Sequence, residues 1–156
     1  MKEEAWRFNE SFLFGILKVI WDNLGYPSSK YFSTLVARDF LDFLKKKISL
    51  DNMSVEEALN SVTKFFVDSG IAKAISVEMR KNDVIVNVEG CIYNSVDSKL
   101  ANQVKAPIFV CPLVNVLMGI VEHKTDLMGE FGPVEIKDSK CNLIFDLYPK
   151  KTKIHV

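Results

Sequence analysis

Apolar residues in the first third of the chain recur at helical spacing. Over residues 6–24 they fall at i, i+3 and i+4, which predicts one face of an amphipathic helix: Phe12, Leu13, Ile16, Leu17, Ile20, Trp21 and Leu24. Gly25 is expected to end this helix, and residues 26–29 read as a turn. A second helix is predicted over residues 29–48 by the same spacing.

A third helix begins at a recognisable N-terminal signal. Ser54 is followed three residues later by Glu57, the capping-box pattern in which each side chain bonds the backbone N–H of the other residue. Apolar positions continue at helical spacing to Phe66, and Gly70 is expected to close the helix.

The period then changes from helical to alternating. Ile75, Val77 and Met79 alternate with polar residues, and residues 84–89 repeat the pattern after a polar turn. These two segments predict a β-hairpin.

Between this hairpin and the end of the chain the pattern predicts two more helices and a second hairpin. The first helix is expected over residues 95–104, and the second follows Cys111, because Pro112 suits a first helical position. Pro107 is expected to start a β-like lead-in to Cys111, residues 129–133 read as a loop, and residues 134–136 are expected to pair with residues 141–148 around Asp138 and Ser139. A short edge strand is expected beyond Pro149.

The expected fold is therefore α+β, with N-terminal helices packed on an antiparallel sheet and further helices between the two hairpins. The 156 residues contain no repeat or linker, so residues 1–156 are expected to form a single domain.

Composition excludes some partners. The 20 basic and 20 acidic side chains cancel, which argues against a nucleic-acid-binding face, and no apolar run is long enough for a membrane span. The N-terminus lacks the pattern of a signal peptide, so a cytoplasmic location with reduced thiols is expected.

Three cysteines could carry chemistry. Cys91, Cys111 and Cys141 each lie at the end or junction of a predicted element, where distant side chains can converge. Two interpretations stay open: three unlinked core cysteines, or one shared metal site. No pair has the close C-x-x-C spacing of a strong zinc motif.

The spacing of residues along the predicted elements limits which side chains could be the fourth ligand of such a site. His123 follows Cys111 by twelve residues on one helix, so about 18 Å would separate them. A two-residue turn at 138–139 places Glu135 on the face opposite Cys141, whose alternating neighbours are apolar. One more residue in that turn would reverse this placement, so Glu135 stays open as a ligand together with Glu89 and Glu122. His155 is too near the terminus to be placed.

A thiol enzyme is a further alternative, because a cysteine at a helix N-terminus can have a lowered pKa. No histidine is placed beside Cys111 by its sequence context, and no glycine-rich phosphate-binding motif occurs. We therefore favour a protein without catalytic activity.

The second half resembles the 4-vinyl reductase domain family. The resemblance is carried by a strand ending in Gly90-Cys91, by Cys111-Pro112-Leu113 opening a helix, and by a closing strand that begins at Cys141. The resemblance implies a fold similar to Golgi transport-complex subunits and to sensor domains of aromatic-responsive regulators, an apolar ligand, and zinc bound by cysteines. Many members have Glu-x-x-Cys upstream of the last cysteine where this chain has residues 132–136, so Cys91 and Cys111 would supply the other ligands.

The function expected from the resemblance is binding of a small apolar molecule, in a regulatory or sensory homodimer. The pocket is expected among aromatic and aliphatic residues of the N-terminal helices: Phe12, Leu13, Ile16, Phe40, Phe65 and Phe66. The alternative is a scaffolding homodimer without a ligand, in which the same residues form a core or a subunit interface.

Overall fold

The structure is a computed structural model that describes residues 2–104 and 111–150. Its sheet has four antiparallel strands in the order β1-β2-β4-β3: β1 (Ala74–Met79), β2 (Asp83–Glu89), β3 (Leu127–Lys137) and β4 (Lys140–Pro149). The helices are α1 (Lys2–Lys47), the 3-10 turn η1 (Leu50–Asn52), α2 (Val55–Asp68), α3 (Asn94–Val104) and α4 (Pro112–Lys124). The predicted α+β class is confirmed. The expected lead-in at Pro107 and the edge strand beyond Pro149 lie outside the described residues.

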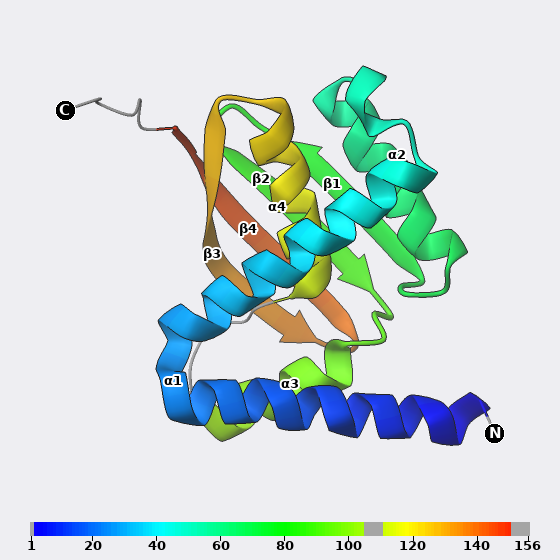
Figure 1. The fold of residues 1–156 in the computed structure, drawn as a ribbon, viewed down its shortest axis with the longest axis vertical. Coiled ribbons are helices and arrows are strands. Elements are labelled where there is room, and N and C mark those ends of the chain that lie inside the picture. The colour runs from blue at the N-terminus through cyan, green and yellow to red at the C-terminus, as the bar shows by residue number, and fades with distance from the viewer. Residues whose placement is uncertain (1, 105–110, 151–156) are drawn as a thin grey trace.

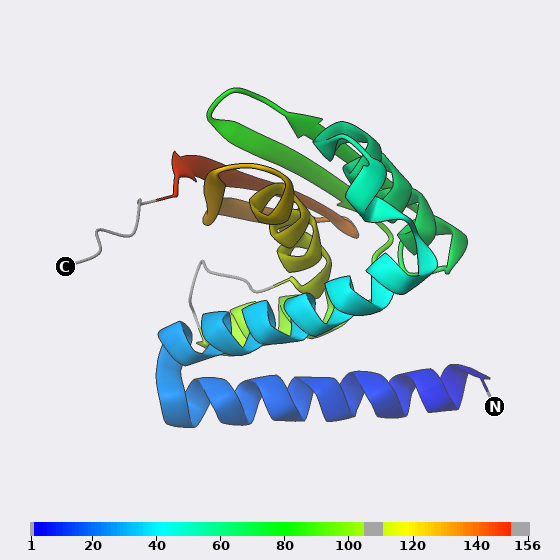
Figure 2. The same cartoon turned by 45° about the horizontal axis from the view of Figure 1, so that its top comes forward.

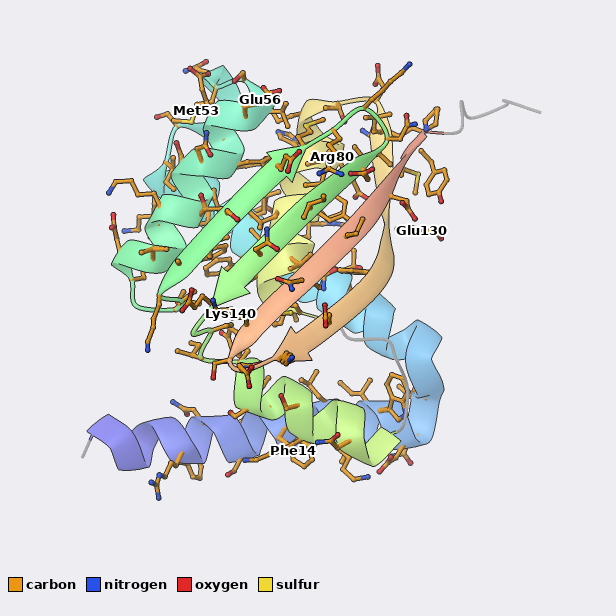
Figure 3. The ribbon with its side chains drawn as sticks, turned by 180° about the vertical axis from the view of Figure 1, so that it is seen from behind. Phe14, Met53, Glu56, Arg80, Glu130 and Lys140 are labelled. Atoms are coloured by element: carbon orange, nitrogen blue, oxygen red, sulfur yellow. The ribbon has the colours of Figure 1, made fainter. Side chains whose placement is uncertain are left out.

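One face of the sheet is buried beneath helices and the other is open. Alternate residues of the two central strands point to the buried face, among them Val84, Val86, Leu143 and Phe145, each 0% exposed. Between them, Asn87 and Asn142 are exposed. Figure 3 shows this open face with no helix across it. The period-2 pattern thus fixes which face meets the core.

The helices are arranged in layers over the buried face. Helix α4 lies on the sheet, the second half of α1 crosses over α4, and α2 packs beside β1 and α4 (Figures 1 and 2). The first half of α1 runs alongside α3, away from the sheet. No helix in the described ranges is long and apolar enough to cross a bilayer.

Helix α1 consists of two straight segments joined at Gly25. Its φ of 71° and ψ of −178° are non-helical, a conformation that favours glycine. The predicted break at Gly25 is confirmed, but the predicted turn at residues 26–29 is wrong, because those residues are already helical. Pro27 suits a first helical turn, where no N–H bond is needed.

Helix α2 begins with the predicted capping box. The Glu57 N–H donates to Ser54 Oγ at 3.2 Å, and the Ser54 N–H donates to Glu57 Oε2 at 2.7 Å. These bonds satisfy donors that a helix N-terminus otherwise leaves open.

The second hairpin differs from its prediction. The expected loop at residues 129–133 is wrong: β3 starts at Leu127 and continues through a bulge between Phe131 and Val134, which accommodates Gly132 and Pro133. Gly129 lets α4 pack closely, since a Cβ there would lie 2.6 Å from Met118 Sδ and the Met118 side chain would have to shift.

The turn of this hairpin is as predicted. Asp138 and Ser139 both have positive φ, 49° and 62°, as in the turns that suit two-residue hairpins. Ile136 pairs with Cys141, so Glu135 is exposed while Cys141 is 7% exposed.

Candidate ligand-binding site

An apolar cavity of about 130 Å³ lies where α1, α2 and α4 meet. Phe40 of α1 and Phe66 of α2 form one wall, with ring centroids 6.0 Å apart and planes at 12°. The other lining residues come from four places in the chain: Val36, Ala37, Ile71, Tyr93, Pro112, Leu113 and Val116. Residues far apart in sequence therefore converge on one small, mostly aromatic and aliphatic space.

The six residues predicted to line a pocket fall into two groups. Phe40 and Phe66 line the apolar cavity, and Phe65 lies edge-on to Phe66 at 6.2 Å without lining it. Phe12 and Ile16 instead line an open groove of about 440 Å³ on the first segment of α1, where Leu13 is half-buried. The bend at Gly25 separates the two groups.

The groove on the first segment is part of an exposed apolar stripe. Phe8 and Phe12 are 69% and 61% exposed and stack on each other at 6.2 Å. Val19 and Leu24 are 61% and 62% exposed on the same segment. Large apolar side chains exposed together in this way mark an interaction surface.

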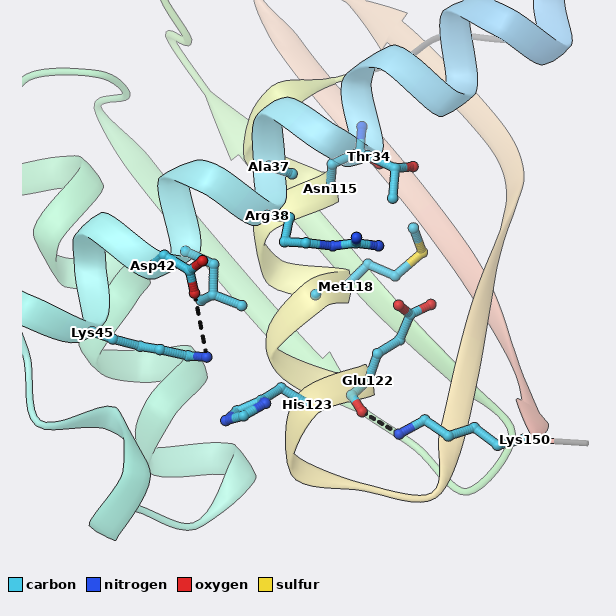
Figure 4. A pocket seen from close by; sticks show the side chains of 12 residues that line it. Thr34, Ala37, Arg38, Asp42, Lys45, Asn115, Met118, Glu122, His123 and Lys150 are labelled. Atoms are coloured by element: carbon cyan, nitrogen blue, oxygen red, sulfur yellow. Dashed lines mark hydrogen bonds and ion pairs between the residues drawn. The ribbon is translucent and has the colours of Figure 1, made fainter. Parts of the chain in front are cut away.

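A second, polar cavity of about 430 Å³ lies between α1 and α4 (Figure 4). Its rim carries charged side chains from both helices and from the end of β4, and its floor carries small and apolar ones: Thr34, Ala37, Arg38, Leu41, Asp42, Lys45, Asn115, Met118, Gly119, Glu122, His123 and Lys150.

Several of its charged side chains are held by an ion pair or by hydrogen bonds to the backbone. Lys45 Nζ lies 3.6 Å from Asp42 Oδ1, and Glu122 Oε1 accepts from the Gly129 N–H at 3.0 Å. Lys150 Nζ donates to the backbone oxygens of Glu122 and Thr125.

Asn115, which also lines this cavity, has a side-chain oxygen without a hydrogen bond. It is 2% exposed, and its Oδ1 has no hydrogen-bond partner among the described residues. A buried acceptor without a partner costs about 1–3 kcal/mol of stability. The sequence alone distinguishes this position, since Asn115 is the one polar side chain between Leu113 and Val121.

The three cysteines belong to the sheet-facing core. Cys111 and Cys141 are 3% and 7% exposed, Cys91 is half-buried against the same core cluster, and no disulfide joins them. Cys111 is the N-cap of α4, as predicted, although its side chain makes no capping hydrogen bond. His123 is exposed at the other end of α4, where its Nε2 lies 3.4 Å from Asp51 Oδ1.

The described residues contain no group of three or more His, Cys, Asp or Glu side chains placed to hold a metal ion. In this geometry the cysteines do not form such a group. Zinc binding stays a prediction made from the resemblance.

Comparison with solved structures finds a similar fold in another protein. The phenol-responsive sensory domain of the transcription activator PoxR, solved with phenol, is similar with a TM-score of 0.60. The alignment covers 92% of this chain and 76% of that one, at 12% sequence identity, so the likeness is one of fold.

The family of this chain is shown by its match to the sequence pattern of a known family. Residues 10–138 match the family described as "Putative rubredoxin C-terminal domain", and the chain belongs to that family. These comparisons do not show the 4-vinyl reductase family that the sequence resembles, whereas the fold expected from that resemblance is supported. No curated protein matches the chain.

Proposed function

We propose that this domain is a sensory module that binds a single-ring apolar molecule in the cavity between Phe40 and Phe66. The observation that carries the proposal is the partly open cavity itself, which aromatic and aliphatic side chains from three helices and two connecting segments line. Dry apolar cavities of about 150 Å³ are known to accept benzene, so about 130 Å³ suits one ring.

The similar fold of a domain solved with phenol supports the same ligand class. Burial of a ring in an apolar site is worth about 25 cal/mol per Å² of surface removed from water.

A titration with phenol and toluene, followed by NMR chemical shifts of the lining residues, tests this function. We expect saturable shifts for residues around Phe66 and Leu113. Val36→Phe, at a 44% exposed position on the cavity wall, should abolish them by filling the entrance. Val19→Phe makes the same change at a 61% exposed position of the same helix and should leave binding intact. The absence of saturable shifts in the wild-type protein would contradict the proposal.

The module is further proposed to act as a homodimer joined through the first segment of α1. The exposed stripe of Phe8, Phe12, Val19 and Leu24 favours this arrangement, because burying it would remove large apolar surfaces from water. The same stripe also favours the alternative of a scaffolding dimer without a ligand. Native mass spectrometry separates the two, since it reports subunit number, retained ligand and bound zinc together.

A further inference from the structure

Gly15 lies in the interior of the first segment of α1, where glycine stabilises a helix less than alanine does. Its backbone is helical, so no left-handed conformation requires glycine there. A Cβ at Gly15 would meet nothing within 4 Å in the described part of the chain, so no close contact requires glycine either. The fold of a single copy therefore does not account for this residue, and the space above it is open.

The open space at Gly15 has the form of a hole for one side chain of another helix. Four residues that line the groove of about 440 Å³ stand at positions i, i+3, i+4 and i+7 of the helix: Phe12, Gly15, Ile16 and Val19. In a coiled coil, four such residues surround each side chain that the facing helix inserts. The missing side chain at Gly15 deepens this hole, so a large side chain fits it.

The same segment carries a seam that suits helix pairing. Its members follow one another at intervals of four, three and four residues: Phe8, Phe12, Gly15 and Val19. This is the spacing of positions a and d along a two-stranded coiled coil. The three side chains of the seam are at least 61% exposed. Figure 2 shows the first segment as an outer layer, with α3 and the second segment of α1 on one side of it, so a second helix has access.

The sizes of the side chains along the seam favour an antiparallel partner of the same sequence. When two copies cross antiparallel about a two-fold axis at the level of residues 13–14, Phe12 of each copy lies over Gly15 of the other, and Phe8 lies over Val19. Every layer then holds one large and one smaller residue. A parallel pair would set Gly15 on Gly15 and leave a void beside layers of two phenylalanines.

Charge favours the same orientation. Arg7 and Asp22 are exposed near opposite ends of the segment. The antiparallel pair brings Arg7 of one copy within about 3 Å, measured along the helix axis, of the level of Asp22 of the other. A parallel pair would set each of these charges beside its own copy. Antiparallel helices also place each positive N-terminal end beside a negative C-terminal end.

We propose that the first segment of α1 pairs with the same segment of a second copy as an antiparallel coiled coil, in which Phe12 of each copy fills the hole at Gly15 of the other. The proposal rests on the proposed homodimer and adds its orientation and register. A dimer of another orientation therefore contradicts this pairing alone, and ligand binding in the Phe40 cavity is independent of both.

Disulfide formation tests the orientation. Phe8→Cys and Val19→Cys are oxidised alone and as a mixture, with the wild-type protein as the control for the three native cysteines, and are compared on non-reducing gels. In the antiparallel pair the two copies of residue 8 lie about 16 Å apart along the axis, whereas a disulfide spans about 7 Å at most between Cα atoms. We expect a covalent dimer in the mixture and none above the wild-type level in either variant alone. Covalent dimers of each variant alone, or none in the mixture, would overturn the proposal.

An exchange of the two side chains tests the register. Gly15→Phe fills the hole and Phe12→Gly removes the ring that enters it, so each should raise the dimer dissociation constant at least about tenfold in sedimentation equilibrium. The double variant restores the contact with the two positions exchanged, and its dissociation constant should return to within about threefold of the wild-type value. Lys46→Phe adds the same ring at an exposed position of the second segment and should change nothing.

Two outcomes of this exchange contradict the proposal in different ways. Losses that simply add in the double variant would refute the register and leave the dimer standing. A wild-type protein that sediments as a monomer would refute the dimer and the pairing together.

Discussion

Phe40 and Phe66 stack with their rings nearly parallel, and the pair joins the second segment of α1 to α2. Phe66 is completely buried, and Phe65 packs edge-on against it from the same helix. The stack is at once part of the core and a wall of the apolar cavity. Stability and the proposed ligand binding therefore depend on the same contact.

Removal of the Phe66 ring should be strongly destabilising. Phe66→Ala is expected to lower the free energy of unfolding by about 3–5 kcal/mol, because it enlarges a cavity in a well-packed core. Urea denaturation followed by circular dichroism measures the loss. Phe43→Ala, at a 44% exposed position of α1, should cost much less, and equal losses would contradict the assigned packing.

A charge on the exposed stripe should separate the proposed dimer. Phe12→Glu is expected to shift sedimentation at micromolar concentration from dimer to monomer, because an unpaired carboxylate would be buried at the interface. Met128→Glu places the same charge at a 50% exposed position of β3 and should leave the dimer intact. A wild-type protein that sediments as a monomer would rule out this interface.

The capping box should make stability depend on pH in one direction. Hydrogen bonds from the backbone and then the side chain of Ser54 lower the pKa of the Glu57 carboxyl. A carboxyl whose pKa is lower in the folded state adds stability above its unfolded pKa, and this is lost as pH falls through the folded value. The stability gap between wild type and Glu57→Ala should therefore be largest near neutral pH and shrink in acid.

Thermal unfolding of both proteins between neutral pH and the acid range measures this gap. Glu56→Ala is the matched control, since Glu56 is exposed in the same helical turn and no bond to Ser54 holds it. A gap that widened on acidification would contradict the predicted direction.

The turn of the second hairpin offers a stabilising substitution. Ser139 has a φ of 62°, a conformation that costs a residue with a side chain about 1–2 kcal/mol. Ser139→Gly should raise the free energy of unfolding by about 1 kcal/mol. Ser76→Gly, in the extended strand β1, should lower it instead, and denaturant titrations of both variants provide the comparison.

Local signals predicted most of the fold. The Ser54 capping box, Pro112 after Cys111 and the turn at Asp138 each depend on residues close in sequence, and all three are present in the structure. The start of β3 was not predicted, because it depends on pairing with a strand further along the chain. Glycine is uncommon in strands, which suggested a loop at Gly129. Gly129 nevertheless pairs with Leu147 of β4, and this pairing stabilises the start of β3.

The candidate sites were harder to predict because they depend on how helices cross. The aromatic residues on both halves of α1 look alike in sequence, and only the bend at Gly25 shows that Phe12 and Phe40 lie on different surfaces. Asn115 was visible as a polar residue in an apolar helix. Its burial depends on the way α1 crosses α4, which no residue close to Asn115 in sequence signals.

The single non-helical residue at Gly25 also makes the first segment of α1 a lever. Residues 2–24 extend about 34 Å from that point, at ~1.5 Å per residue. A rotation of about 10° at Gly25 would displace the far end by about 6 Å, given that helix length. The second segment lines both cavities, so Gly25 is the joint through which a rotation beside either cavity would reach the apolar stripe.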